Sequence, residues 1–234
     1  MVLDKRNEDI LAAVVRDFIE SGEPVSSGWL YEHHDFGIKP AMIRLILKDL
    51  DEAGYLVQPN YSAGRVPSDR GYEFFADYAL RNTEPSHPVQ ELANSFERRA
   101  WGELLEELSH ELGLLSAATM MAAHETYKSG LETLIDHFDW QSRAEIKQVI
   151  HDFEALDERL EGAKRELAAN NEIQIFIGKK SPVTRSQYLS VVASDFECDG
   201  ERMVLLAIGP KRMDYQKTAK VFKNLKKATS KKKK

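Results

Sequence analysis

The sequence predicts an α+β protein in two parts, and three observations lead to this prediction. Within residues 1–80, three short amphipathic helical patterns precede two strand patterns. A stretch with two prolines and several Ser, Thr and Asn residues, 81–90, then reads as a linker. Three strand-like runs gather near the end of the chain, after further helical patterns. A chain of 234 residues, 42% apolar and 30% charged, is long enough for two small folded domains.

The first part begins with three helices that have recognisable start and stop signals. They are predicted over Leu3–Ser21, from Ser26 or Ser27 to about His34, and from Pro40 to Gly54. Tyr55–Gln58 and Val66–Pro67 read as strands on either side of the turn-rich stretch 59–65. This order of three helices and a two-stranded hairpin predicts a winged helix-turn-helix, and a further helix is expected after Ser68 through Tyr78.

The second part, 91–225, mixes helices and strands. Helices are predicted over Glu91–Leu112, around Lys128–Asp139 and over Ser142–Ala169, while Leu114–Ala122 fits a buried strand or a buried helix. Strands are predicted over Ile173–Ile177, Tyr188–Ser194 and Met203–Ile208. Asp214 can cap a last helix, and Arg212 can pair with it in the preceding turn.

Charge is distributed unevenly along the chain. Residues 1–80 hold 8 basic and 14 acidic residues (net −6), 81–216 hold 15 and 24 (net −9), and 217–234 hold 9 and none (net +9). Residues 226–234 are therefore expected to form a basic disordered tail, either a solvated solubility tail or an arm that binds phosphates without sequence preference.

Several classes of protein are disfavoured. The longest uncharged, largely apolar stretch, residues 113–123, is far shorter than the ~20 residues of a membrane span, and no signal peptide is evident. We expect a cytoplasmic protein with no membrane association. A single cysteine, Cys198, forms no internal disulfide and no cysteine-based zinc cluster. The histidines, among them His33, His34, His124 and His137, lack metalloprotease spacing, and no phosphate loop or nucleophile elbow occurs. The sequence predicts no enzyme, no metal and no cofactor.

The third helix is the candidate DNA-reading element, because the second helix of a helix-turn-helix lies in the major groove. Its outward residues can contact a duplex: Arg44 can bond a guanine edge, and Lys39 and Lys48 can meet phosphates. In the hairpin, Gly64 permits a positive φ at the turn, and Arg65 is expected at the tip, where it can reach a phosphate or the minor groove. The predicted DNA-binding residues are Ser27, Lys39, Ala41, Met42, Arg44, Leu45, Lys48, Tyr61, Ser62, Ala63, Gly64 and Arg65.

These residues resemble a known family. GEPVSSGWL, MIR and LDEAGYLVQPNYSAGRVPSDRGYEFFADY resemble the N-terminal domain of the HrcA family of bacterial heat-inducible transcription repressors. The segment IGPKRMDY at residues 208–215 is similar to that family's C-terminal signature, and residues 129–134 and 177–178 resemble two further segments. The similarity is dense over 1–80 and sparse over 91–225.

The resemblance implies a repressor that binds the inverted-repeat operator called CIRCE as a homodimer, upstream of chaperone genes. It also implies a GroEL-type chaperonin as the partner that favours the active fold, so that repression follows chaperonin availability. Residues 91–225 then correspond to a GAF-like regulatory and dimerisation domain. That domain is reduced here, because the gap between Leu114–Ala122 and residues 129–131 is too short for the family's inserted dimerisation domain. We expect dimerisation through the long 142–169 helix or a sheet edge.

Departures from the family pattern leave an alternative open. Pro40, Met42 and Leu45 stand where the family has Ser/Thr and Asn, so the base preference is expected to differ. The alternative is an adaptor that senses a partner or ligand and has lost operator recognition, with its lysine tail docking on an acidic surface or RNA. A small-molecule pocket lined by Trp140, Phe176, Tyr188 and Arg212 is a further possibility, although such residues are more often core. The repressor interpretation requires both an open third helix and a hairpin tip that is not folded inward with Arg65 locked in an intramolecular ion pair; if either condition fails, only ancestry is left.

Overall fold

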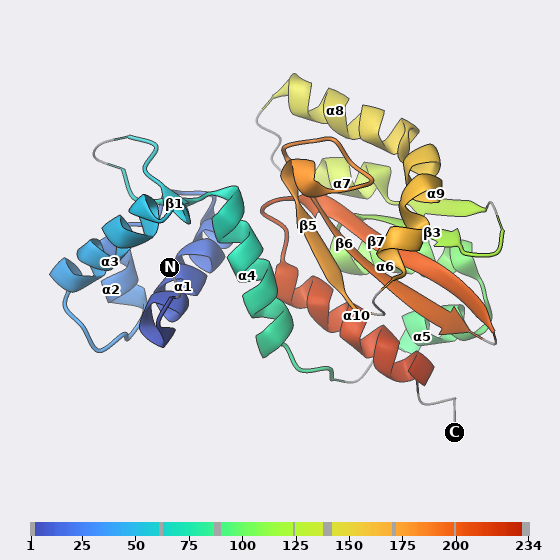
Figure 1. The fold of residues 1–234 in the computed structure, drawn as a ribbon, viewed down its shortest axis with the longest axis horizontal. Helices are drawn as coiled ribbons and strands as arrows, with labels where there is room; N and C mark the ends of the chain where they lie inside the picture. The colour runs from blue at the N-terminus through green and yellow to red at the C-terminus, as the bar shows by residue number, and fades with distance from the viewer. Residues whose placement is uncertain are drawn as a thin grey trace. The chain divides into compact units, whose positions relative to one another are not determined.

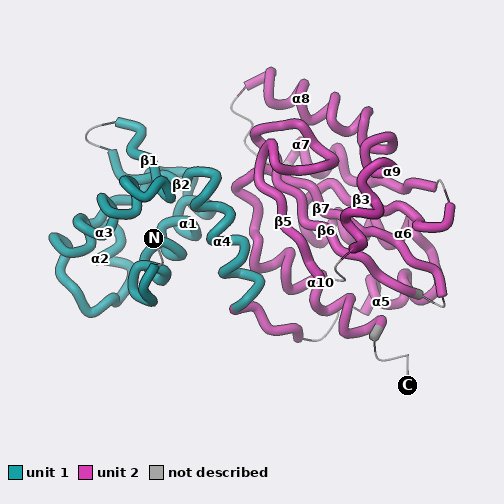
Figure 2. The backbone as a smooth tube through the Cα atoms, in the orientation of Figure 1, with its two compact units in different colours: residues 1–81 teal, residues 82–234 magenta. Residues whose placement is uncertain are grey.

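The protein consists of two compact units, residues 1–81 and 82–234 (Figure 2). A computed structural model describes residues 3–60, 63–86, 90–123, 125–137, 142–169, 172–198 and 200–230. Helices and a sheet occur together in the described residues, so the protein is α+β (Figure 1).

Unit 1 consists of α1 (Lys5–Ser21), α2 (Ser27–His33), α3 (Pro40–Glu52), β1 (Leu56–Val57), β2 (Val66–Pro67) and α4 (Asp69–Asn82). The predicted start and stop signals act as expected. The Asp4 carboxylate accepts the Asn7 N–H at 2.8 Å and begins α1, and Gly22 ends it in the left-handed conformation (φ 72°). The core is formed by the apolar faces of these helices, including Ile10, Leu11, Leu30, Ile43, Leu50 and Phe75. α4 extends to Asn82, so the first residues of the predicted linker are helical.

Unit 2 is built on an antiparallel sheet. In the described residues the strand order is β4 (Thr126–Ser129), β3 (Leu115–Met120), β7 (Glu201–Pro210), β6 (Leu189–Cys198), β5 (Gln174–Ile177). β3 is buried along its whole length, which indicates that both faces of the sheet are covered.

Helices pack on the two faces: α5 (Gln90–Glu97), α6 (Trp101–Leu112), α7 (Leu131–His137), α8 (Arg143–Glu154), α9 (Leu156–Leu167) and α10 (Tyr215–Ser230). On one face, the Ser190 and Tyr215 hydroxyls are 2.9 Å apart and the Phe196 ring packs on Phe222, so α10 lies there. On the other face, Arg202 donates to the Asp195 carboxylate at 2.8 Å and to the carbonyl oxygen of Ala168, directly after α9.

Three sequence-based predictions for unit 2 need correction. The helix expected over 91–112 is two helices, because Arg99 adopts a left-handed conformation (φ 57°) between them. The helix expected over 142–169 is likewise α8 and α9, which meet at Ala155. Lys128 lies on β4 rather than on a helix, because residues 126–129 pair with β3 before Gly130 starts α7.

The predicted start of the disordered basic tail at residue 226 is also wrong. Residues 226–230, predicted as disordered, belong to α10, and the Lys226 amine donates to the Asp195 carbonyl at 3.0 Å. Burial lowers the pKa of Lys226, and the neighbouring Asp195 carboxylate opposes that shift. Residues 231–234 are outside the described part. Among the described residues, no helix combines the length and apolar character that a membrane span requires.

Candidate nucleic-acid interface

The α2–α3 pair is positioned by one carboxylate of α1. Asp17 accepts the Trp29 indole N–H at 3.0 Å and bonds His34 Nε2 at 2.9 Å, so it holds both α2 and the turn that follows it. The Ser26 hydroxyl caps α2 by accepting the Trp29 N–H. Gly37, at φ 66°, turns the chain toward α3. Ser27 is only 9% exposed, so little of this predicted DNA-contacting residue is open to a duplex.

α3 buries one face and opens the other. Ile43, Leu47 and Leu50 are buried in unit 1. The exposed residues are Ala41, Met42, Arg44, Leu45, Lys48, Asp49 and Glu52, preceded by exposed Lys39. Among the described residues the side chains of Lys39 and Arg44 have no ion-pair partner, whereas Lys48 pairs with Glu52 at 3.4 Å while both stay 66% exposed. All of the predicted α3 residues therefore lie on its open side.

The hairpin is tied to the rest of unit 1 at its base. Val25 and Arg65 exchange two backbone hydrogen bonds of 2.9 and 2.8 Å, which place Arg65 beside the α1–α2 connection. A Cβ on Gly64 would lie 2.5 Å from the Val25 carbonyl carbon, so only glycine fits there. Gly64 does not use the positive φ that glycine permits; it is needed here because two backbones approach each other closely.

The predicted position of Arg65 at the hairpin tip is also wrong. It lies at the base of the hairpin, and its Nε is 2.9 Å from an Asp51 carboxylate oxygen at the end of α3. The Arg65 side chain is only 16% exposed. It joins the hairpin to α3 and is not a free cation at a tip, so one of the two conditions for the repressor interpretation fails while the other, an open α3, holds.

The tip of the hairpin is described only in part. Ala63 donates its N–H to the Asn60 carbonyl oxygen at 2.9 Å, and the Gln58 amide bonds the Ala63 carbonyl oxygen. Tyr61 and Ser62, both predicted to contact DNA, lie outside the described residues.

Sequence reasoning missed the residues that position this surface. Asp17 holds α2, Asp51 holds Arg65, and Arg70 stacks on Tyr55 (4.2 Å) while donating to the Ala53 carbonyl oxygen. Acidic residues on an amphipathic helix normally face solvent, so nothing in the local pattern singled out Asp17 or Asp51.

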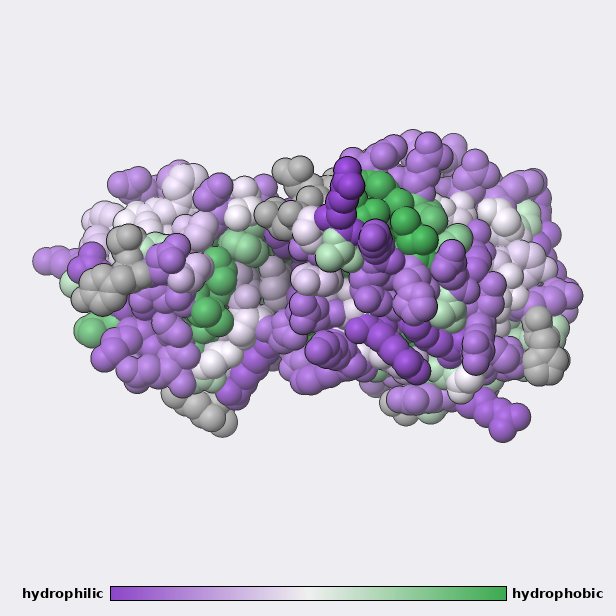
Figure 3. All heavy atoms as spheres, turned by 90° about the horizontal axis from the view of Figure 1, so that it is seen from above, coloured by the Kyte–Doolittle hydropathy of each residue, from purple (hydrophilic) through white to green (hydrophobic). Residues whose placement is uncertain are grey.

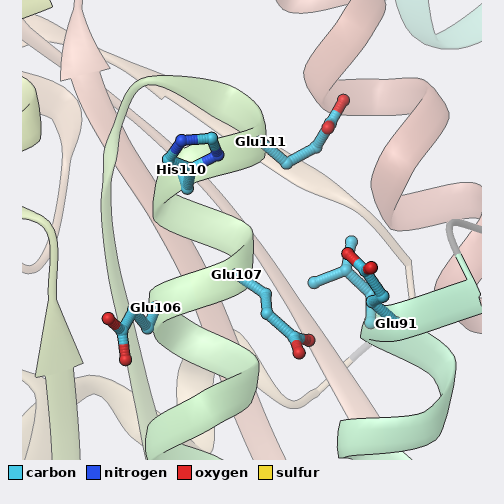
Figure 4. Close-up of a pocket in the computed structure, with 6 residues that line it drawn as sticks. Glu91, Glu106, Glu107, His110 and Glu111 are labelled. Carbon is cyan, nitrogen blue, oxygen red and sulfur yellow. The ribbon is translucent and has the colours of Figure 1, made fainter.

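Unit 2 contains a separate pocket of about 300 Å³ between α5 and α6 (Figure 4). It is lined by Glu91, Leu92, Glu106, Glu107, His110 and Glu111. In Figure 4, the Glu107 side chain extends from α6 toward α5, from which Glu91 projects, whereas Glu106 lies on the opposite side of α6. The residues predicted to line a pocket, Phe176, Tyr188 and Arg212, are not among these, and Trp140 lies outside the described residues. Within the described ranges, no three His, Cys, Asp or Glu side chains are grouped so that they can hold a metal.

Known proteins resemble this chain in sequence and in fold. A family model, the HrcA protein C terminal domain, matches residues 77–219, more than half of the chain. The heat-inducible transcription repressor HrcA of Pelotomaculum thermopropionicum is 44% identical over 92 residues, which cover 39% of this chain and 26% of that protein. The HrcA repressor of Beutenbergia cavernae is 38% identical over 143 residues, which cover 58% and 38%. The match thus spans less than half the length of these relatives.

A crystal structure described only as that of a hypothetical protein aligns over 98% of both chains, with a TM-score of 0.76 and 15% identity. This likeness extends over both units and shows a shared fold. The class defined so far is a two-unit α+β protein with an open helix in its first unit. By its family match, the chain belongs to the HrcA family.

Proposed function

We propose that this chain is a DNA-binding transcription repressor of heat-shock genes rather than an enzyme, and that unit 1 is a winged helix-turn-helix. The observation that carries the proposal is the open face of α3, which presents Arg44 and Lys39 without ion-pair partners in the described part of the chain. The relatives named as heat-inducible transcription repressors supply the regulatory role.

In this proposal α3 enters the major groove. Arg44 reads a guanine edge, and Lys39 at the start of the helix contacts a phosphate. Lys48 exchanges its partner Glu52 for a phosphate, which costs little because both side chains of the pair are largely exposed to solvent. The hairpin lies beside the duplex backbone, and the Arg65–Asp51 pair holds the hairpin at its angle to α3.

Two copies bind an inverted repeat such as CIRCE, and the reduced GAF-like unit 2 pairs them. The candidate dimer surfaces are α8, whose Ile150 is 38% exposed, and the edge strand β5. A GroEL-type chaperonin is the proposed regulatory partner. Light scattering at micromolar concentration tests the pairing, and a strict monomer contradicts it.

Fluorescence anisotropy with a labelled CIRCE-like duplex and a scrambled duplex of equal composition tests the function. The protein should be used as the full chain and as a chain ending at Ser230, which retains all of α10. We expect the operator to bind at least one hundredfold more tightly than the scrambled duplex in both forms. Equal affinity for the two duplexes contradicts the proposal.

The second candidate is an adaptor that keeps the fold without operator recognition. It is favoured by the engagement of Arg65 with Asp51 and by the exposed carboxylates of Asp49 and Glu52 on α3. Residual binding of both duplexes that disappears when residues 231–234 are removed is the outcome that selects it.

A further inference from the structure

Two apolar side chains are exposed on the helix that we propose reads DNA. Leu45 is 57% exposed and Met42 is 48% exposed. Few large apolar side chains are this open elsewhere in the described residues, and the space-filling view shows hydrophobic atoms only in patches on a largely hydrophilic face (Figure 3). Exposed leucine is therefore an exception here.

Helix geometry places Leu45 near the middle of the open face. It follows the buried Ile43 by two residues, which at about 100° per residue puts it on the opposite side of α3. Ala41 and Lys48 lie one turn before and one turn after it, and both are exposed. Arg44 and Met42 flank this row on its two sides. The N-terminal part of the open face is thus an apolar centre with Arg44 beside it, and toward the C-terminal end Lys48 is followed by the exposed acidic residues Asp49 and Glu52.

We propose that Leu45 and Met42 read the C5 methyl groups of thymines, so that the operator of this protein places thymine next to the guanine bound by Arg44. This inference rests on the proposed function and names the bases that the site selects. In the major groove only thymine offers a methyl group, and apolar side chains contact it directly. Leucine cannot form the paired hydrogen bonds by which an amide side chain reads adenine.

The charges on the same face decide between a duplex and an apolar protein partner. Protein interfaces are depleted in Lys, Asp and Glu, whereas this face has exposed Lys48, Asp49 and Glu52 within two turns of Leu45. An anionic duplex satisfies the cations through its phosphates and the apolar side chains through thymine methyls. A protein partner would have to cover the Lys48–Glu52 pair and supply a carboxylate to Arg44 beside an apolar patch.

The test is methyl removal from the DNA. A binding site is first selected from a random duplex library with the full chain, and each thymine of the selected site is then replaced by deoxyuridine, which lacks only the methyl group. We expect about three- to fivefold weaker binding at one or two positions in each half-site, next to the guanine, and no change elsewhere.

Protein variants identify the side chains that contact the thymine methyl groups. Leu45→Ala should lose the preference for thymine over deoxyuridine at the position that Leu45 contacts, and the double variant Leu45→Ala/Met42→Ala should lose this preference at every position. The matched control Val57→Ala, at an apolar residue of β1 that is 47% exposed, should retain the full thymine preference.

The outcomes separate the two levels of the proposal. Specific binding that ignores every thymine-to-uracil change overturns this inference and leaves the repressor function standing. Methyl sensitivity that is unchanged in the double variant Leu45→Ala/Met42→Ala also overturns it. Failure to select any sequence overturns the proposed function, and the inference with it.

Discussion

The ion pair of Arg65 with Asp51 sets the angle between the hairpin and α3. Both side chains are partly buried, 16% and 31% exposed, and they join elements that a short loop alone would leave free to shift. An ion pair in such a site contributes more to stability than a solvated pair. Removal of one partner leaves the other charge unpaired in a place where little water can solvate it.

Arg65→Ala should therefore lower the free energy of unfolding of the full chain by about 1–2 kcal/mol. A denaturation double-mutant cycle with Asp51→Ala measures the coupling, and strictly additive losses contradict the assignment. Lys48→Ala is the matched control, since its pair with Glu52 is 66% exposed on both sides and should change stability by less than about 0.5 kcal/mol.

Gly64 is the second residue on which the hairpin depends. A Cβ at this position would overlap the Pro24–Val25 backbone, which cannot move without breaking the Val25–Arg65 pairing. Gly64→Ala should destabilise the protein by about 2 kcal/mol or more, measured by chemical denaturation. Gly28→Ala lies within α2, and its new Cβ would be 3.7 Å from the Ser26 hydroxyl, an ordinary contact. This change should be neutral or stabilising, because alanine favours the helix. Equal effects of the two changes contradict this role.

At the scale of elements, the proposed function assigns base recognition to Arg44 on α3 and a contact with the DNA backbone to Lys39 at its N-terminus. Arg44→Ala should reduce affinity for the operator and leave affinity for a scrambled duplex unchanged. The ratio of the two affinities should therefore fall about tenfold or more.

Lys39→Ala should weaken binding to both duplexes alike and reduce the slope of log affinity against log salt by about 1. Anisotropy titrations over a series of salt concentrations measure both quantities. The same pattern of loss in the two variants contradicts this division between base and backbone contacts.

The helices and strands of unit 1 could be predicted because their signals are local. Ser26, Pro40 and Gly22 act within one turn of their own positions. The breaks at Arg99 and Ala155 could not be predicted, because apolar spacing continues across them and tertiary packing decides where the helix stops. The same limit applies to the site: α3 exposure follows from periodicity, whereas the partner of Arg65 depends on a fold that brings position 51 beside 65.

At the scale of the whole molecule, positive charge concentrates at the C-terminal end. α10 contains no acidic residue between Tyr215 and Ser230; its Lys220 and Lys227 are exposed, whereas Lys226 is turned toward Asp195. Four further lysines follow at 231–234. This end of the chain can add affinity for any polyanion without adding sequence preference.

Removal of residues 231–234 should lower affinity for scrambled DNA several-fold and reduce its salt slope, while the ratio of operator to scrambled affinity stays the same or rises. A matched variant with Ser or Gly at these four positions keeps the chain length and should behave like the truncation. A fall in that ratio means that the tail takes part in recognition.

The central claim, that the open face of α3 meets duplex DNA, is tested most directly by placing a negative charge in its middle. The affinity of Leu45→Glu for the selected operator, measured at physiological salt, should be at least one hundredfold lower than that of the wild type, because a carboxylate facing phosphates and base edges costs several kcal/mol. Gly102→Glu adds the same charge at an exposed position of α6 and should bind normally. Operator affinity of Leu45→Glu equal to that of Gly102→Glu contradicts the account.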